Sequence, residues 1–165
     1  MLWGWSVVIL LRSCEKLKYR KANIDDIDKL VVLRKKQLVD EGIEPNIDID
    51  RELYVFFKNK LSDGTLIQWL VEDNEEIIAC GAVIFYEFPP CYTNKTGKKA
   101  YITNMYTNEN YRGQGIATKL LTKLVDEVKI SGISQIWLGA SKMGRPVYKK
   151  FGFMETDVFL ELNIF

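Results

Sequence analysis

The sequence contains no histidine among its 165 residues. This absence excludes Ser-His-Asp and Cys-His nucleophile systems, zinc sites with histidine ligands, and sites in which histidine is the general base. Acid–base chemistry in this protein would therefore depend on aspartate, glutamate, tyrosine, cysteine, lysine or water.

Cysteine is also scarce, with Cys14, Cys80 and Cys91 as the only three. Their spacing matches no metal-binding pattern, so we expect no metal site, and an odd number cannot all form disulfides. Cys80 lies in an apolar stretch, which favours a reduced thiol and a cytoplasmic location. The net charge of only +1 gives no general attraction to nucleic acid, so we expect no nucleic-acid partner.

The apolar run from Leu2 to Leu11 is too short to cross a bilayer, which requires about 20 residues, and we expect no membrane partner. No basic segment precedes it and no clear cleavage site follows, so a signal peptide is poorly supported. We interpret residues 1–17 as an apolar extension that is extraneous to the fold; an interface helix or a membrane-surface helix is the alternative. Residues 18–165 are long enough to bury a full core as a single domain.

The pattern of apolar residues predicts elements in the order β-α-α-β-β-β-α-β-α-β. Asn23 can cap the first helix, and a second helix follows at about Asp50–Leu61. Leu66–Glu72 and Glu76–Tyr86 are expected to form a hairpin, in which Gly81 indicates a bulge or a close approach of another group. The later elements are expected to be a strand from Tyr101, a helix ending at Ile130, a strand at Gln135–Ala140, a helix at Gly144–Phe151 and one or two closing strands within Phe153–Leu162.

The segment Phe88–Ala100 is too long for a tight hairpin and contains two prolines and several polar residues. Loops of this length in compact domains often bind ligands. The segment is therefore interpreted either as a wall of a substrate site or as an exposed connector.

The segment Tyr101–Ile130 is the most informative stretch of the chain. It begins as a strand, passes through Arg112-Gly113-Gln114-Gly115 and continues as an amphipathic helix. The first N–H groups of a helix have no acceptor within the helix, and the helix dipole adds positive charge there. Glycines let an anion approach the backbone closely, so the turn predicts a phosphate-binding site.

Two familiar glycine patterns do not fit this turn. A P-loop requires Gly-Lys-Ser/Thr and a dinucleotide fingerprint requires a third glycine, but Thr118 stands at the deciding position. What remains is the pattern Arg112-x-x-Gly115-x-Ala117.

Three motifs in order along the chain resemble one enzyme family. They are Tyr106-Thr107, Tyr111-Arg112-Gly113-Gln114-Gly115-Ile116-Ala117 and Tyr148-Lys149-Lys150-Phe151-Gly152-Phe153. Together with the order of the elements, they resemble the GCN5-related N-acetyltransferase (GNAT) family over about Lys18–Leu162. The resemblance implies an α/β fold with a mixed sheet that is splayed between its fourth and fifth strands and flanked by about four helices.

The resemblance also implies acetyl-CoA as a co-substrate that lies in this opening. The backbone of Met105, Tyr106 and Thr107 would pair with its pantetheine arm. The pyrophosphate would be held by the backbone of Arg112, Gly113, Gln114, Gly115, Ile116, Ala117 and Thr118. Family members often have an asparagine at the position of Ser141, which would contact the cofactor through its hydroxyl group.

By the same resemblance, Tyr148 would be the general acid that protonates the departing thiolate, while core packing is the alternative role for its ring. An N–H group near Met105–Thr107 would stabilise the oxyanion. For the base, Glu87 and a water held by Asn104 are both candidates. The expected reaction is direct transfer of the acetyl group to a primary amine of a small molecule or a peptide, through a ternary complex. The enzyme is also expected to be a homodimer. A non-catalytic acyl-CoA-binding regulatory module is the alternative.

Overall fold

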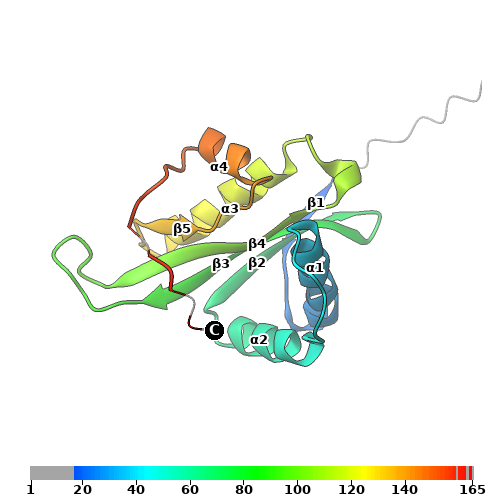
Figure 1. Cartoon of the computed structure of the whole chain (residues 1–165), viewed down its shortest axis with the longest axis horizontal. Coiled ribbons are helices and arrows are strands. Elements are labelled where there is room, and N and C mark those ends of the chain that lie inside the picture. The colour runs from blue at the N-terminus through cyan, green and yellow to red at the C-terminus, as the bar shows by residue number, and fades with distance from the viewer. Residues whose placement is uncertain (1–16, 159, 163, 165) are drawn as a thin grey trace, which may run out of the picture.

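The computed structural model of the chain describes residues 17–158, 160–162 and 164. Five strands form one mixed sheet in the order β1-β2-β3-β4-β5, and helices cover both of its faces (Figure 1). The strands are β1 (Lys18–Lys21), β2 (Leu66–Asp73), β3 (Glu76–Glu87), β4 (Lys98–Thr107) and β5 (Ile136–Leu138). The α-helices are α1 (Ile27–Asp40), α2 (Asp50–Ser62), α3 (Ile116–Ile130) and α4 (Arg145–Phe151). The fold class implied by the family resemblance is thus confirmed.

The sheet opens between β4 and β5. All other neighbours are antiparallel, but these two strands are parallel and pair only from Ala100–Ile136 to Ile102–Leu138. Tyr101 Oη accepts a hydrogen bond from the backbone N–H of Gly139 at 2.9 Å, just beyond the last pair. The five residues of β4 that follow Ile102 have no strand partner on this side. This is the splay that the resemblance implied.

A bulge in β4 accompanies the opening. Cys80 pairs with Tyr106 while Ala82 pairs with Thr103, so Asn104 and Met105 together lie opposite Gly81. A Cβ atom at Gly81 would lie 2.6 Å from Sδ of Met105, which explains the glycine. Asn104 adopts a φ of +52°, a left-handed conformation that asparagine tolerates better than most residues. The close approach expected at Gly81 is confirmed.

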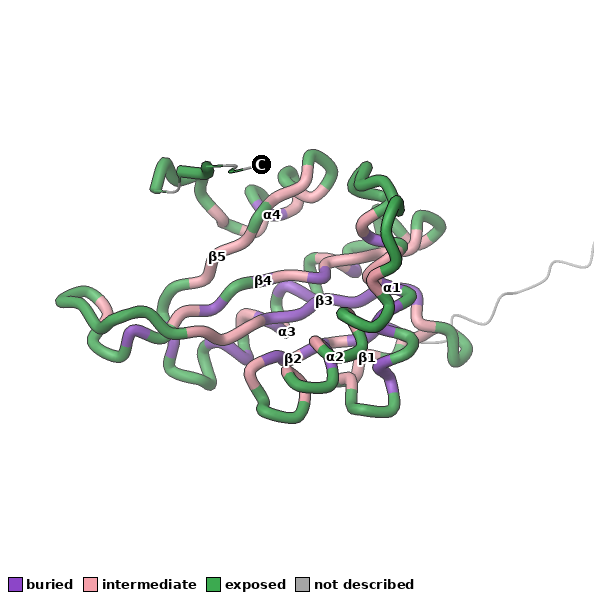
Figure 2. The backbone as a smooth tube through the Cα atoms, turned by 60° about the horizontal axis from the view of Figure 1, so that its bottom comes forward, coloured by how far each residue is buried: buried purple, intermediate pink, exposed green. Residues whose placement is uncertain are grey.

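The apolar core lies on both faces of the sheet. Figure 2 shows buried residues concentrated along the central strands. On one face, Leu30 of α1 and Phe57 of α2 pack against Leu70 of β2. On the other face, α3 contributes its apolar stripe, with Leu120, Leu121 and Leu124 fully buried. The apolar residues that the sequence placed on one side of this helix are therefore the ones buried in the core.

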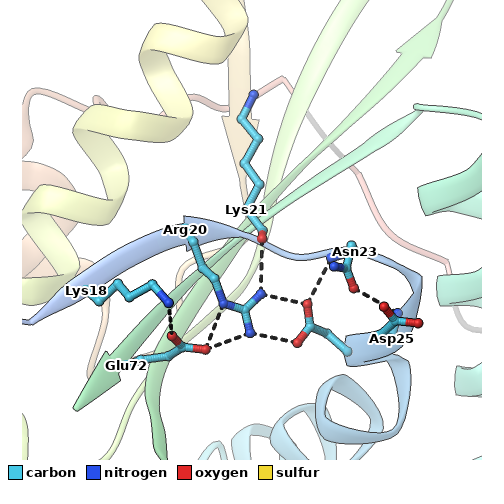
Figure 3. A network of polar contacts seen from close by, with 7 residues as sticks. Lys18, Arg20, Lys21, Asn23, Asp25 and Glu72 are labelled. Carbon is cyan, nitrogen blue, oxygen red and sulfur yellow. Dashed lines mark hydrogen bonds and ion pairs between the residues drawn. The ribbon is translucent and has the colours of Figure 1, made fainter. Parts of the chain in front are cut away.

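A polar network joins the start of the domain to the sheet (Figure 3). Arg20 of β1 donates two hydrogen bonds to Asp26, at 2.7 and 2.8 Å, and one to Glu72 of β2 at 2.7 Å. Asn23 caps the helical turn as expected, because its side chain accepts from Asp25 while its N–H donates to Asp26. The network fixes the path from β1 into α1, which lines the site described below.

We expect Asp26→Asn to lower the free energy of unfolding by about 3 kcal/mol, because it weakens a buried bidentate ion pair. The Arg20 guanidinium holds the pKa of Asp26 below its usual range. The ionised carboxylate therefore adds stability above its unfolded pKa of about 4, and this contribution is lost as the pH falls through the lower folded pKa. Urea unfolding at neutral and acid pH measures the effect, with the exposed neighbour Asp25→Asn as the control. If the difference in free energy of unfolding between wild type and Asp26→Asn stayed the same at acid pH, the prediction would be contradicted.

Two sequence expectations are corrected. β4 begins at Lys98, so the connecting loop is 88–97 and not Phe88–Ala100; the loop is ordered by its own bonds, including those of Asn94 with Cys91 and Lys98. No strand forms within residues 153–158 or 160–162. This segment has strand-like composition, but a strand needs a partner edge, and Met154, Val158, Leu160 and Leu162 are instead mostly exposed.

The expectation that residues 1–17 are extraneous falls on residues 1–16, which lie outside the described residues, and on Leu17, which packs beside Tyr19 against the α3 side of the core. No helix within the described ranges is long and apolar enough to span a membrane. We expect deletion of residues 1–16 to leave the melting temperature and turnover almost unchanged. Extending the deletion through Leu17 should cost about 1 kcal/mol, because apolar burial is lost. A large drop in melting temperature or turnover after deletion of residues 1–16 would show that these residues pack on the domain.

Candidate active site

A cavity of about 510 Å³ lies where β4 and β5 diverge. This volume is within the usual range for small-molecule sites, about 300–1,000 Å³. Five parts of the chain supply its walls: α1, the second half of β4, the turn before α3 with the first turn of that helix, the segment after β5, and α4. The opening of the sheet and the glycine-rich turn therefore belong to one site.

The glycine-rich turn has the geometry of an anion cradle. Gly113 and Gly115 have φ values of +77° and +78°, and a Cβ atom added to either would meet nothing within 4 Å. Gly115 is the N-cap of α3 without a capping side chain, and Lys119 N–H donates to its carbonyl at 3.0 Å. The N–H groups from Ile116 to Thr118 thus have no acceptor within the helix. The N-terminus of α3 therefore presents N–H groups without a partner in the helix, and the space beside Gly113 and Gly115 is open to an anion.

The cradle is held in place from three directions. Tyr111 donates a hydrogen bond from its hydroxyl to Asp73, the last residue of β2, at 2.7 Å. Arg112 donates from Nε to the carbonyl oxygen of Thr107 at 2.9 Å. Its terminal nitrogen forms an ion pair with Asp40 at the end of α1. This last contact could not be predicted from the sequence, since Asp40 and Arg112 are 72 positions apart.

Tyr148 projects from α4 into the same cavity. Its ring is packed edge-on against Phe153, and a Cβ atom at Gly144 would lie 2.8 Å from Cε2 of the ring, so any other residue there would displace the ring. Burial chiefly, and then the charge of Glu41, raises the pKa of Tyr148 to about 12. The phenol is therefore protonated at neutral pH, and its hydroxyl makes no hydrogen bond to a described residue.

Ser141 lines the cavity where the chain enters α4. Its Oγ accepts a hydrogen bond from Gly144 N–H at 3.1 Å. The hydroxyl proton is not used in that bond, so the side chain can still donate to a ligand.

The residues expected at the site are brought together, with one exception. Met105, Tyr106, Thr107, Arg112, Gly113, Gly115, Ile116, Ala117, Thr118, Ser141 and Tyr148 all line the cavity. Gln114 does not; its side chain turns back to the carbonyl oxygen of Asn110 at 3.4 Å.

Two of the candidates that the sequence left open, Glu87 and the 88–97 loop, do not line the cavity. Glu87 pairs with Lys98 at one end of the β3–β4 hairpin, whereas the cavity lies along Tyr101–Thr107 and extends to the other end. For the same reason the 88–97 loop contributes no residue to the cavity. The antiparallel register of the hairpin separates both from the site, which leaves the loop as an exposed connector. Asn104 does line the cavity, although its side chain also donates to buried Gln68 at 3.2 Å.

Sequence reasoning missed the contribution of α1. Arg34, Gln37 and Asp40 of this helix and its C-cap residue Glu41 line the cavity, and none of the four was singled out from the sequence. The available signal was a polar stripe at helical spacing that includes a buried glutamine, Gln37. α2 contributes nothing to the cavity lining.

Comparison with known proteins supports the resemblance. The family model of the Acetyltransferase (GNAT) family matches residues 33–153. A crystal structure described as a predicted acetyltransferase with acetyl-CoA from Clostridium acetobutylicum is 59% identical, with a TM-score of 0.88 over 90% of this chain and 96% of that chain. A GCN5-related N-acetyltransferase from Ralstonia eutropha has the same fold, at 23% identity, a TM-score of 0.78 and coverage of 89% and 98%.

Two curated relatives match only part of the chain. Thialysine N-epsilon-acetyltransferase of Mus musculus is 30% identical over 42% of this chain and 41% of its own length, and the protein of the same name from Sus scrofa is 33% identical over 37% and 38%. The chain thus spans about two fifths of the length of these relatives. The family model, by contrast, covers most of the chain and includes the cradle, the open strand and Tyr148. The chain belongs to the acetyltransferase (GNAT) family.

Proposed function

We propose that this protein transfers the acetyl group of acetyl-CoA directly to a primary amine in a ternary complex. The observation that carries the proposal is the shared cavity, in which a glycine cradle, an unpaired strand edge and a protonated phenol all meet. Each of these features matches one part of the cofactor or one step of the transfer.

The features of the cavity fit the chemical groups of acetyl-CoA. The N–H groups at the start of α3 are donors for a pyrophosphate, and the positive φ angles of Gly113 and Gly115 leave their donors uncovered. The free edge of β4 at Met105–Thr107 can pair with an extended amide chain as an added strand would. When bound, the cofactor supplies an activated acetyl group as a thioester.

Tyr148 is the proposed general acid. Its hydroxyl is protonated, faces the cavity and is not engaged by another described residue, so it can donate its proton to the sulfur that leaves. A backbone N–H of the bulged segment near Met105 is the proposed donor to the developing oxyanion, because a bulge leaves one residue outside the regular ladder. A water held by Asn104 remains the proposed base.

The proposed acceptor class is a primary amine of a small molecule or a peptide. The curated relatives are named as thialysine N-epsilon-acetyltransferases, which directs attention to an amine at the end of an amino-acid side chain, although they share only two fifths of their length with this chain. Amino acids with such amines therefore belong in the first panel of acceptors.

The test is release of free thiol from acetyl-CoA in the presence of a panel of amines, combined with calorimetry of CoA binding. Amine-dependent thiol release with an acetylated product is the expected result. Tight binding of CoA without turnover of any amine would favour a non-catalytic acyl-CoA-binding regulatory module. Failure to bind CoA would overturn both.

A further inference from the structure

One face of α1 brings three polar side chains of different character to the cavity. Arg34, Gln37 and Glu41 are separated by three and four residues, so they form one stripe along the helix. All three line the cavity, and none belongs to the segments proposed to hold acetyl-CoA. The stripe is therefore available to the acceptor.

Gln37 orients Glu41 and contributes an acceptor atom of its own. Gln37 is 7% exposed, and its Nε2 donates to Glu41 Oε1 at 3.1 Å. A carboxylate can only accept, so this bond fixes which end of the amide faces Glu41. Oε1 of Gln37 is left buried without a donor among the described residues. Glu41 forms no ion pair with a described lysine or arginine, so the two residues together offer acceptors to an ammonium group.

Arg34 supplies the opposite charge at a distance. It is half-buried at the cavity wall and has neither an ion pair nor a hydrogen bond with another described residue. Seven residues separate it from Glu41, which corresponds to about 10 Å along a helix. The two side chains form no ion pair with each other, and a cation partly withdrawn from water is stabilised by an anion.

Glu41 is also close to the proposed chemistry. Glu41 and Tyr148 line the same cavity, and the negative charge of Glu41 contributes, after burial, to the raised pKa of Tyr148. An ammonium at Glu41 would therefore lie beside the acid, while Arg34 would receive the distant end of the same molecule.

From these contacts we propose that the α1 stripe binds a zwitterionic acceptor, an amino acid whose side-chain amine meets Glu41 and Gln37 and whose carboxylate meets Arg34. The inference rests on the proposed function and specifies its substrate class. Arg34 and Glu41 are binding residues, and Gln37 is a positioning residue for Glu41.

The test compares lysine with 1,5-diaminopentane, which is the same molecule without its carboxylate. For the wild-type protein we expect kcat/KM to be at least tenfold higher for lysine. Arg34→Gln should reduce this ratio to about one by weakening lysine alone. Glu41→Gln should raise KM at least tenfold for both amines without changing their ratio. Gln37→Leu should raise both KM values less, with kcat preserved.

Glu44→Gln is the matched control, because Glu44 is an exposed carboxylate near Glu41 that does not line the cavity. Acetyl-CoA affinity should be unchanged in all four variants. A wild-type ratio of one or less, an unchanged ratio in Arg34→Gln, or normal KM values in Glu41→Gln would overturn the inference. If no amine is turned over, the proposed function fails, and calorimetry of lysine with the CoA-saturated protein still decides the inference, because binding must weaken in Arg34→Gln and Glu41→Gln.

Discussion

Gly115→Val should abolish CoA binding, with affinity falling beyond the range of calorimetry. Gly115 has a φ of +78°, and the space where a side chain would project is empty of protein atoms. That space is where the pyrophosphate must approach the N–H groups of α3, so a branched side chain would occupy the cradle itself. A β-branched residue is also strained at this angle, by about 1–2 kcal/mol, so the domain should stay folded but melt somewhat earlier.

Gly132→Val separates these two effects. Gly132 lies beyond the other end of α3 with a φ of +70°, and a Cβ atom there also meets nothing within 4 Å. It should show a similar loss of stability with unchanged CoA affinity. Unchanged CoA affinity in Gly115→Val would remove the cradle from the proposed function, whereas equal losses of affinity in both variants would mean that strain alone is responsible.

Tyr148→Phe should lower kcat about 10²-fold, the low end of the range for general-acid catalysis. The variant keeps the ring and its packing against Phe153 but removes the O–H group. That hydroxyl forms no hydrogen bond to a described residue, so stability and CoA affinity should remain near native. The defect should shrink with thioesters of more acidic thiols, because such leaving groups need less proton donation.

Tyr86→Phe is the control for Tyr148→Phe. Tyr86 is a half-buried tyrosine of β3 that lies outside the cavity, and its replacement should leave kcat unchanged. If Tyr148→Phe loses stability while kcat stays intact, the ring is a packing element and the proton comes from elsewhere.

The cavity residues that we propose for the cofactor could be predicted from the sequence because they are local. The cradle depends on glycines and a helix start within a few residues of each other, and the strand edge immediately precedes it. Short-range rules for positive φ and for helix ends therefore apply directly. The same rules do not place side chains: Gln114 lies between cavity-lining residues, but its side chain turns back to Asn110.

The acceptor half depends on contacts between distant segments. The stripe on α1 reaches the cavity only because the helix packs across the sheet, and the pairing of Asp40 with Arg112 spans 72 positions. Glu87 failed as a candidate because hairpin register, which composition does not encode, places it at the wrong end of β4. The closing strands failed because strand propensity is a property of the segment, whereas a strand also requires a neighbouring edge.

The ion pair between Asp40 and Arg112 would make the two halves of the cavity thermodynamically dependent on each other if cofactor binding disrupts it. Asp40 ends the helix that carries Arg34, Gln37 and Glu41, while Arg112 opens the cofactor cradle. If phosphate draws Arg112 away from Asp40, the end of α1 loses a tether at the moment when the cofactor arrives. Linkage then requires reciprocity: the factor by which bound cofactor changes acceptor affinity equals the factor by which bound acceptor changes cofactor affinity. A single ion pair would thus give the two substrates a common cooperativity, and Asp40→Asn should reduce it in both directions at once.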